Sequence, residues 1–161
     1  FEGLGAGAVT VAPYMGADSV LPFTAFKDHW TVLLALTSNP SAEDFEFHGT
    51  PPLHEVVVER SQAWGTADNL MYVVGATRPD GLARIRSLAP EHFFLVPGVG
   101  AQGGSVEEVA AAGWNDTCGV LVNSSRGILY ASSGADYAEA ARAAAGELHD
   151  AMRRILDENG F

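Results

Sequence analysis

The stretch Phe93-Phe94-Leu95-Val96-Pro97-Gly98-Val99-Gly100-Ala101-Gln102-Gly103-Gly104 decides how the rest of the chain is interpreted. Its first half is an apolar run typical of a buried strand, and its second half is a glycine-rich turn. The next residues, Ser105-Val106-Glu107-Glu108, have the pattern of a capping box that begins a helix. We therefore predict a strand, a tight turn and a helix, with exposed backbone N–H groups at the turn that suit an anion.

The spacing Gly98-x-Gly100-x-x-Gly103 also satisfies the dinucleotide-binding fingerprint. That fingerprint belongs to the first strand and helix of its fold and is followed, about 20 residues later, by an acidic residue that binds a ribose. Here the corresponding position falls near Asn123, and at least three strand candidates precede the turn. The pattern therefore favours a phosphate-binding turn over a nicotinamide or flavin site.

A second apolar run, residues 119–123, ends in Ser124-Ser125-Arg126-Gly127. In (β/α)8 barrels, a phosphate site is often formed by the loops after the last two strands, beside the start of a short helix. Arg126 would supply a forked, permanently charged donor, and Gln102 would supply an amide. These two consecutive strand ends therefore predict the two halves of a phosphate cup.

Strand candidates begin near residues 8, 30, 70, 93 and 119, and helical patterns lie in the gaps between them and after the last. This alternation indicates an α/β fold with a parallel sheet covered by helices. Five such units are too few for a complete eight-stranded barrel of about 250 residues. Helices are predicted over residues 54–64 (despite three consecutive valines), 80–88, 106–112 and 135–156, with a shorter one from residue 18 or 19 to about 28 and a single helical turn over 42–47.

Composition and charge narrow the classes of function. Apolar residues make up 47% of the 161-residue chain, which is typical of one globular domain. A net charge of −11 disfavours nucleic acid and anionic membranes as partners. The single cysteine suits a reducing, cytoplasmic environment, and we expect neither a membrane span nor a signal peptide. The five histidines lack metal-binding spacing, and no Gly-x-Ser-x-Gly elbow is present.

Taken together, five motifs resemble the orotidine 5′-phosphate decarboxylase family, and most closely its longer bacterial branch. The resemblance runs through essentially the whole chain and respects the order of the motifs. The Pro-Gly-Val-Gly-Ala-Gln-Gly-Gly run is the most specific of them. The motifs are Thr10-Val11-Ala12-Pro13-Tyr14-Met15-Gly16, Leu36-Thr37-Ser38-Asn39-Pro40, Val74-Gly75-Ala76-Thr77, the run from Pro97 to Gly104, and Asn123-Ser124-Ser125-Arg126-Gly127-Ile128.

This resemblance implies roles for residues at four strand ends. Gln102 and Arg126 correspond to the residues that bind the substrate phosphate, and the backbone of Ser125 and Arg126 adds N–H donors. Ser38 matches the serine that hydrogen-bonds the pyrimidine edge, and Pro97 matches a proline packed near the pyrimidine.

Two apolar residues complete the implied site. Leu34 and Val74 fall where the family has an apolar pocket beside the scissile carboxylate. Ala12 stands where a more polar residue, often asparagine, is expected, which weakens any role for that loop.

The family's catalytic motif, Asp-x-Lys-x-x-Asp, is absent from the chain. Lys27 is the only lysine, and Ala25 and Trp30 occupy the positions of the two aspartates. We therefore expect residues 1–161 to be the C-terminal portion of one TIM-barrel domain, with strands four to eight of the (β/α)8 barrel. The complete carboxy-lyase would convert orotidine 5′-monophosphate (OMP) to uridine monophosphate (UMP) and CO2 in de novo pyrimidine biosynthesis, without metal or cofactor.

Other interpretations stay open at this stage. The chain could be a non-catalytic phosphate-binding barrel fragment, or part of another phosphate-binding barrel enzyme with a sugar-phosphate or indole substrate. The resemblance implies a homodimer when the domain is complete, and a fragment could pair instead with its missing N-terminal half.

Overall fold

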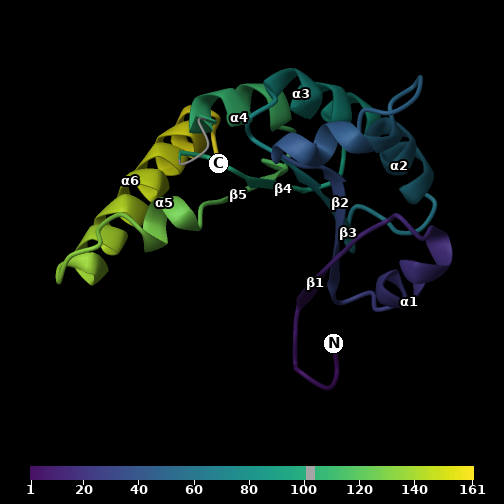
Figure 1. Cartoon of the computed structure of the whole chain (residues 1–161), viewed down its shortest axis with the longest axis horizontal. Coiled ribbons are helices and arrows are strands. Elements are labelled where there is room, and N and C mark those ends of the chain that lie inside the picture. The colour runs from purple at the N-terminus through teal and green to yellow at the C-terminus, as the bar shows by residue number, and fades with distance from the viewer. Residues whose placement is uncertain (101–103) are drawn as a thin grey trace.

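The fold is a five-stranded parallel sheet whose strand order follows the chain, β1-β2-β3-β4-β5 (Figure 1). The computed structural model describes residues 1–100 and 104–161. All five predicted strands form, and the predicted α/β class is confirmed. The strands are β1 (Ala8–Val11), β2 (Trp30–Leu36), β3 (Leu70–Val74), β4 (Phe94–Pro97) and β5 (Val120–Asn123).

Helices occupy the connections between the strands, as the alternating pattern predicts. The four longer predicted helices form within a few residues of their expected bounds, whereas the helix predicted to end near residue 28 forms only two short segments that end at Thr24. The helices are η1 (Ala17–Ser19), α1 (Leu21–Thr24), η2 (Pro40–Asp44), α2 (Leu53–Ser61), α3 (Pro79–Leu88), α4 (Val106–Gly113), α5 (Arg126–Leu129) and α6 (Tyr137–Glu158). The valines of α2 are compatible with a helix because Val58 is fully buried in the core, and such packing overrides a weak local preference for strand.

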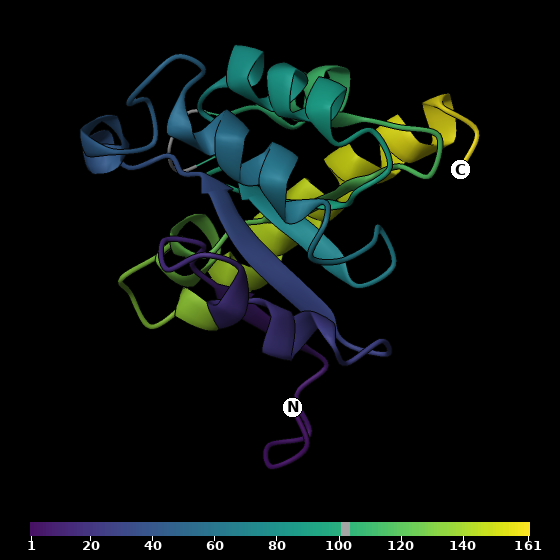
Figure 2. The ribbon, with the colours of Figure 1, turned by 90° about the vertical axis from the view of Figure 1, so that its right-hand side faces the viewer.

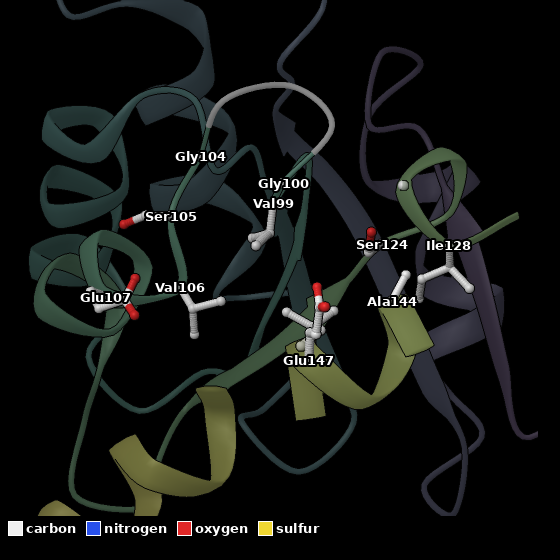
Figure 3. Close-up of a pocket in the computed structure, with 12 residues that line it drawn as sticks. Val99, Gly100, Gly104, Ser105, Val106, Glu107, Ser124, Ile128, Ala144 and Glu147 are labelled. Carbon is white, nitrogen blue, oxygen red and sulfur yellow. The ribbon is translucent and has the colours of Figure 1, made fainter. Parts of the chain in front are cut away.

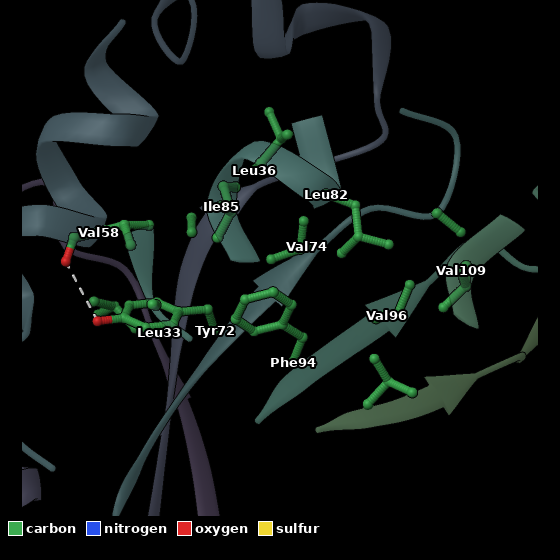
Figure 4. Close-up of a cluster of buried hydrophobic side chains, with 14 of the residues drawn as sticks. Leu33, Leu36, Val58, Tyr72, Val74, Leu82, Ile85, Phe94, Val96 and Val109 are labelled. Atoms are coloured by element: carbon green, nitrogen blue, oxygen red, sulfur yellow. Dashed lines mark hydrogen bonds between the residues drawn. The ribbon is translucent and has the colours of Figure 1, made fainter. Parts of the chain in front are cut away.

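Helices α2, α3 and α4 cover one face of the sheet (Figures 1 and 2). The main core lies in this interface, where Tyr72 and Phe94 are its largest fully buried side chains (Figure 4). The Tyr72 hydroxyl lies 2.9 Å from Ser61 Oγ of α2, and burial raises the pKa of Tyr72 to about 12. A buried polar contact therefore joins this helix to the middle strand of the sheet.

The opposite face of the sheet carries a second, smaller apolar cluster. Its buried members are Val32, Met71 and Val73, and every residue packed against them also comes from a strand or its immediate flank. No helix within residues 1–100 and 104–161 contributes to this cluster. In the same described part, β1 pairs only with β2, and β5 pairs only with β4. We call this face, which no described helix covers, the strand-lined face. The sheet also has two edge strands, β1 and β5, that lack a second partner among the described residues.

Helix α6 packs against the main core through apolar side chains near its C-terminal end. Leu148, Met152 and Ile155 contact the main core, whereas Tyr137 at the start of the helix is 64% exposed. Among the helices that the structure describes, none combines the length and the apolar character needed to cross a lipid bilayer.

A half-buried arginine, Arg86, joins the connections at the amino-terminal ends of the strands. The guanidinium of Arg86 lies 3.7 Å from the centre of the Phe94 ring, and burial lowers the pKa of Arg86 to about 10. The guanidinium nitrogens donate to the backbone carbonyls of Gly113, Ala89, Pro90, His92 and Gly119, at 2.7 to 3.1 Å. One side chain thus satisfies five carbonyls from the segments that follow α3 and α4.

We expect Arg86→Met to lower the free energy of unfolding by roughly 3 kcal/mol, because each of these carbonyls loses a charged donor, although Gly119 O keeps its hydrogen bond from Phe94 N–H. Denaturant titration measures the change. Arg84→Met is the matched control on the same helix, since Arg84 makes an exposed ion pair with Glu55 and should matter much less. Equal stability of the two variants would contradict the structural role of Arg86.

His92 is buried against Tyr72, with the two ring centroids 5.2 Å apart. Neither ring nitrogen of His92 has a hydrogen-bond partner among the described residues. Burial, and then the nearby charge of Arg86, lower the pKa of His92 below its ordinary value of 6.5. The folded protein therefore favours the neutral imidazole.

Stability should consequently fall as the pH drops below about 6.5, because the unfolded chain then binds a proton on His92 more readily than the folded chain. Denaturant titrations between about pH 7.5 and about pH 5 measure this slope. His92→Phe should flatten the slope, whereas His48→Phe, at an exposed position, should leave it unchanged. An unaltered slope in His92→Phe would show that another group controls the acid response.

Candidate functional site

The candidate site lies at the carboxyl edge of the sheet, where parallel strands place all their exits. The exits are joined by backbone hydrogen bonds. Gly75 N–H donates to Leu36 O at 2.8 Å, and Ala76 N–H donates to Pro97 O at 2.9 Å. The ends of β2, β3 and β4 are therefore held side by side, and Pro97 is half-buried at the end of β4.

Glycines allow the strand exits to approach one another closely. A Cβ atom added at Gly75 would lie 2.9 Å from Ser38 Cβ and 3.0 Å from Ser38 N. A Cβ atom added at Gly104 would lie 2.6 Å from Ala76 Cβ. The predicted pyrimidine contact, Ser38, thus sits directly after β2 and against the backbone of the β3 exit.

The glycine-rich turn after β4 requires glycine for its backbone conformation. Gly98 and Gly100 have φ angles of 97° and 79°, in the region that other residues rarely adopt. Gly100 N–H donates to Gly104 O at 2.9 Å, so this amide is used within the turn. The predicted phosphate ligand Gln102 lies outside the described residues.

The capping box predicted at the start of α4 is confirmed. Glu108 N–H donates to Ser105 Oγ at 3.0 Å, and Ser105 N–H donates to Glu108 Oε2 at 3.4 Å. Two of the N–H groups at this helix start are therefore already paired. The anion-binding capacity expected here is smaller than the sequence pattern suggests.

Arg126 is the first residue of the short helix α5. Its side chain is exposed and makes no ion pair with any residue that the structure describes. Ser125 is the N-cap of α5, and its carbonyl accepts hydrogen bonds from Ile128 N–H and Leu129 N–H. The backbone N–H groups that begin such a helix have no acceptor within it, so they can serve a ligand.

A cavity of about 420 Å³ lies between the glycine-rich turn, α5 and α6 (Figure 3). Val99, Ser124 and Ile128 contribute to its lining. Glu107 and Glu147 also line it, and Figure 3 shows the Glu147 carboxylate pointing inward. These negative charges oppose a phosphate inside this cavity, so the exposed Arg126 and the start of α5 are the remaining candidate anion donors.

The structure does not bring Leu34 and Val74 together. Leu34 packs with the cluster on the strand-lined face, whereas Val74 is fully buried in the helix-covered core (Figure 4). Leu34 lies opposite Val73 in the register, and a bulge between Leu34 and Leu36 brings Val74 opposite Leu36. Since neighbouring residues on a strand point to opposite faces, Val73 is the apolar neighbour of Leu34.

The sequence analysis also missed a polar contact beside Ser38. Glu46 Oε2 accepts a hydrogen bond from Thr37 N–H at 2.7 Å, and Glu46 Oε1 accepts one from the Thr37 hydroxyl at 2.7 Å. No short motif spans these two residues, so only the folded chain reveals the pair. Within the described ranges, no group of three or more histidine, cysteine or acidic side chains could hold a metal ion.

Residues 1–144 match the Orotidine 5′-phosphate decarboxylase / HUMPS family. The chain belongs to this family. It is 52% identical over 159 residues to the orotidine 5′-phosphate decarboxylase of Flavobacterium johnsoniae, covering 98% of this chain and 58% of the relative. The orotidine 5′-phosphate decarboxylase of Bacteroides fragilis is 51% identical over 159 residues, with 97% of this chain and 58% of the relative covered.

Solved structures of the family show the same arrangement of strands and helices. Leishmania donovani OMP decarboxylase superimposes with a TM-score of 0.77 and 39% identity, over 93% of this chain and 59% of that one. Leishmania donovani UMP synthase gives a TM-score of 0.78 and 42% identity, over 92% of this chain and 34% of that one. The chain thus spans somewhat more than half the length of the curated decarboxylases that it matches.

We expect Gly75→Ala to displace Ser38 and to lower the free energy of unfolding by about 2 kcal/mol, because the new methyl group has no space. Denaturant titration measures the loss. Gly146→Ala provides the control, since a Cβ there meets nothing within 4 Å and should stabilise α6 by roughly 0.5 kcal/mol. Unchanged stability in Gly75→Ala would mean that the strand exits can separate without cost.

Proposed function

We propose that this chain supplies the phosphate and pyrimidine contacts of an orotidine 5′-phosphate decarboxylase, which converts OMP to UMP and CO2. The observation that carries the proposal is identity of about half the residues to proteins of that name over nearly the whole chain. Arg126, the backbone of Ser125 and Gln102 would bind the phosphate. Ser38 would hydrogen-bond the pyrimidine, beside Pro97.

The apolar pocket of the proposed site would form on the strand-lined face. Leu34 is half-buried there, and Val73 shares its cluster. An apolar surface beside a carboxylate disfavours the charged group relative to the neutral CO2 that leaves. In this proposal Val74 supports the strand from the core side.

Proton transfer is assigned to groups outside these 161 residues. In the family's mechanism, loss of CO2 leaves a carbanion that a lysine protonates. Lys27 precedes β2 at the amino-terminal edge of the sheet, where its Nζ donates to Thr24 O at 3.3 Å. The strand exits are at the opposite edge, so Lys27 is not placed to reach the substrate.

We therefore also propose that residues 1–161 form the C-terminal portion of one TIM-barrel domain. The unpaired edges of β1 and β5 would receive the remaining strands, and these would close the strand-lined face into a barrel interior. A homodimer in the cytoplasm is part of the same proposal. Its support is the family relationship rather than any contact within the chain.

Residues 1–161 would contribute binding energy from the phosphate and pyrimidine contacts, and this energy would stabilise the transition state. In the natural polypeptide that contains this sequence, Arg126→Ala should lower kcat/KM for OMP by about 100-fold, because a charged phosphate contact is lost. The ultraviolet absorbance change as UMP forms measures turnover. Arg142→Ala, which removes an exposed arginine from α6, is the control and should behave as wild type.

An unchanged kcat/KM in Arg126→Ala would contradict the phosphate role. Binding of UMP compared with ribose 5-phosphate separates the remaining alternatives. A decarboxylase site should prefer UMP, whereas a generic sugar-phosphate site or a non-catalytic phosphate-binding fragment should not. Equal affinity for the two ligands would overturn the proposed function.

A further inference from the structure

The contact between Glu46 and Thr37 lies one residue from the proposed pyrimidine ligand Ser38. Glu46 Oε2 accepts from Thr37 N–H at 2.7 Å, and Glu46 Oε1 lies 2.7 Å from the Thr37 hydroxyl, whose single proton is shared with Asn39 Oδ1 at 2.6 Å. Hydrogen bonds to a carboxylate are stronger than those between neutral groups. The two-point contact therefore fixes both the backbone and the side chain of Thr37.

Thr37 needs this acceptor because no strand supplies one. The last pair between β1 and β2 joins Val11 to Leu33, so β1 has ended before Thr37 is reached. On the other side, the neighbouring β3 exit binds Leu36 O through Gly75 N–H at 2.8 Å. Glu46 therefore takes the place of a missing strand partner at the end of β2.

Glu46 is itself held in place by α2. Its carbonyl accepts hydrogen bonds from His54 N–H at 2.9 Å and from His54 Nδ1 at 2.8 Å. His54 is buried, and its Nδ1 must carry the proton because a carbonyl can only accept. Glu46 N–H also donates to Ala42 O at 2.8 Å, which closes the turn after η2.

The same loop is attached to the β3 exit by Arg78. The Arg78 guanidinium lies 4.4 Å from the centre of the Phe47 ring and 2.8 Å from Glu43 Oε1. The segment from Glu43 to Phe47 is thus fixed both to α2 and to the next strand exit. It forms a rigid support for the Glu46 carboxylate.

We propose that Glu46 is a positioning residue for recognition of the pyrimidine. Glu46 fixes Thr37, and the close approach of Gly75 limits Ser38 from the other side, so together they set where the Ser38 side chain can lie. Both carboxylate oxygens are engaged with Thr37, which makes this group a support rather than a proton donor. The inference rests on the proposed function, because it takes Ser38 to contact the base.

The test compares Glu46→Ala, Glu46→Gln and Asp44→Ala in the natural polypeptide that contains this chain. Glutamine preserves the two-point contact, since its oxygen can accept from Thr37 N–H and its amide can donate to the hydroxyl. Asp44→Ala removes a carboxylate from an exposed position of the same loop and controls for charge. Calorimetry gives the affinities for UMP and ribose 5-phosphate, and NMR gives hydrogen exchange at the Thr37 amide.

Glu46→Ala should bind UMP roughly tenfold more weakly, the loss expected for one displaced hydrogen bond, while ribose 5-phosphate affinity stays within about twofold. Its Thr37 amide should exchange faster. Glu46→Gln and Asp44→Ala should resemble wild type in each measurement. A general loss of folding would lower both affinities together, which separates it from a base-specific effect.

If the wild type prefers UMP over ribose 5-phosphate and Glu46→Ala keeps that preference, the positioning role alone is overturned. A wild type that binds UMP no better than ribose 5-phosphate would overturn the proposed function and the positioning role with it. Unchanged exchange at the Thr37 amide in Glu46→Ala would overturn the contact on which the inference depends. The three results are therefore distinguishable.

Discussion

Close backbone approach at the strand exits is the constraint on which the rest of this structure depends. Gly75 lies against Ser38 and Gly104 lies against Ala76, with no room for a further carbon atom at either glycine. The exits of β2, β3 and β4 are consequently held as one surface. Residues that are far apart in the sequence, such as Ser38 and Pro97, reach the same end of the sheet because the strands are parallel, and the glycine contacts hold the neighbouring exits close together.

The two faces of the sheet serve different purposes in the proposed enzyme. The helix-covered face holds the main core, with Tyr72 and Phe94 at its centre, and provides most of the buried apolar surface. Among residues 1–100 and 104–161, the strand-lined face has only the small cluster around Val32, Met71 and Val73. A barrel interior needs this second face, and the pairing edges of β1 and β5 are where the proposed remaining strands would join it.

The amino-terminal and carboxyl-terminal ends of the strands also differ in the polar contacts that stabilise them. At the amino-terminal ends of the strands, the half-buried Arg86 joins several connections through backbone carbonyls. At the carboxyl edge, the polar contacts support residues proposed to bind a ligand, as Glu46 supports Thr37. This division is typical of β/α folds, in which the strand exits carry function and the opposite edge carries stability.

The sequence by itself determined the order of strands and helices, the glycine-rich turn after β4, the capping box at α4 and the family. These features follow from local patterns and short motifs, which is why the structure and the family match confirm them. The separation of Leu34 from Val74 follows from the pairing of Leu34 with Val73 and from the alternation of side chains along a strand, and only the folded sheet fixes this register. The contacts of Glu46 with Thr37 and of Arg86 with its carbonyls likewise required the tertiary structure, because packing between distant segments selects which polar groups meet.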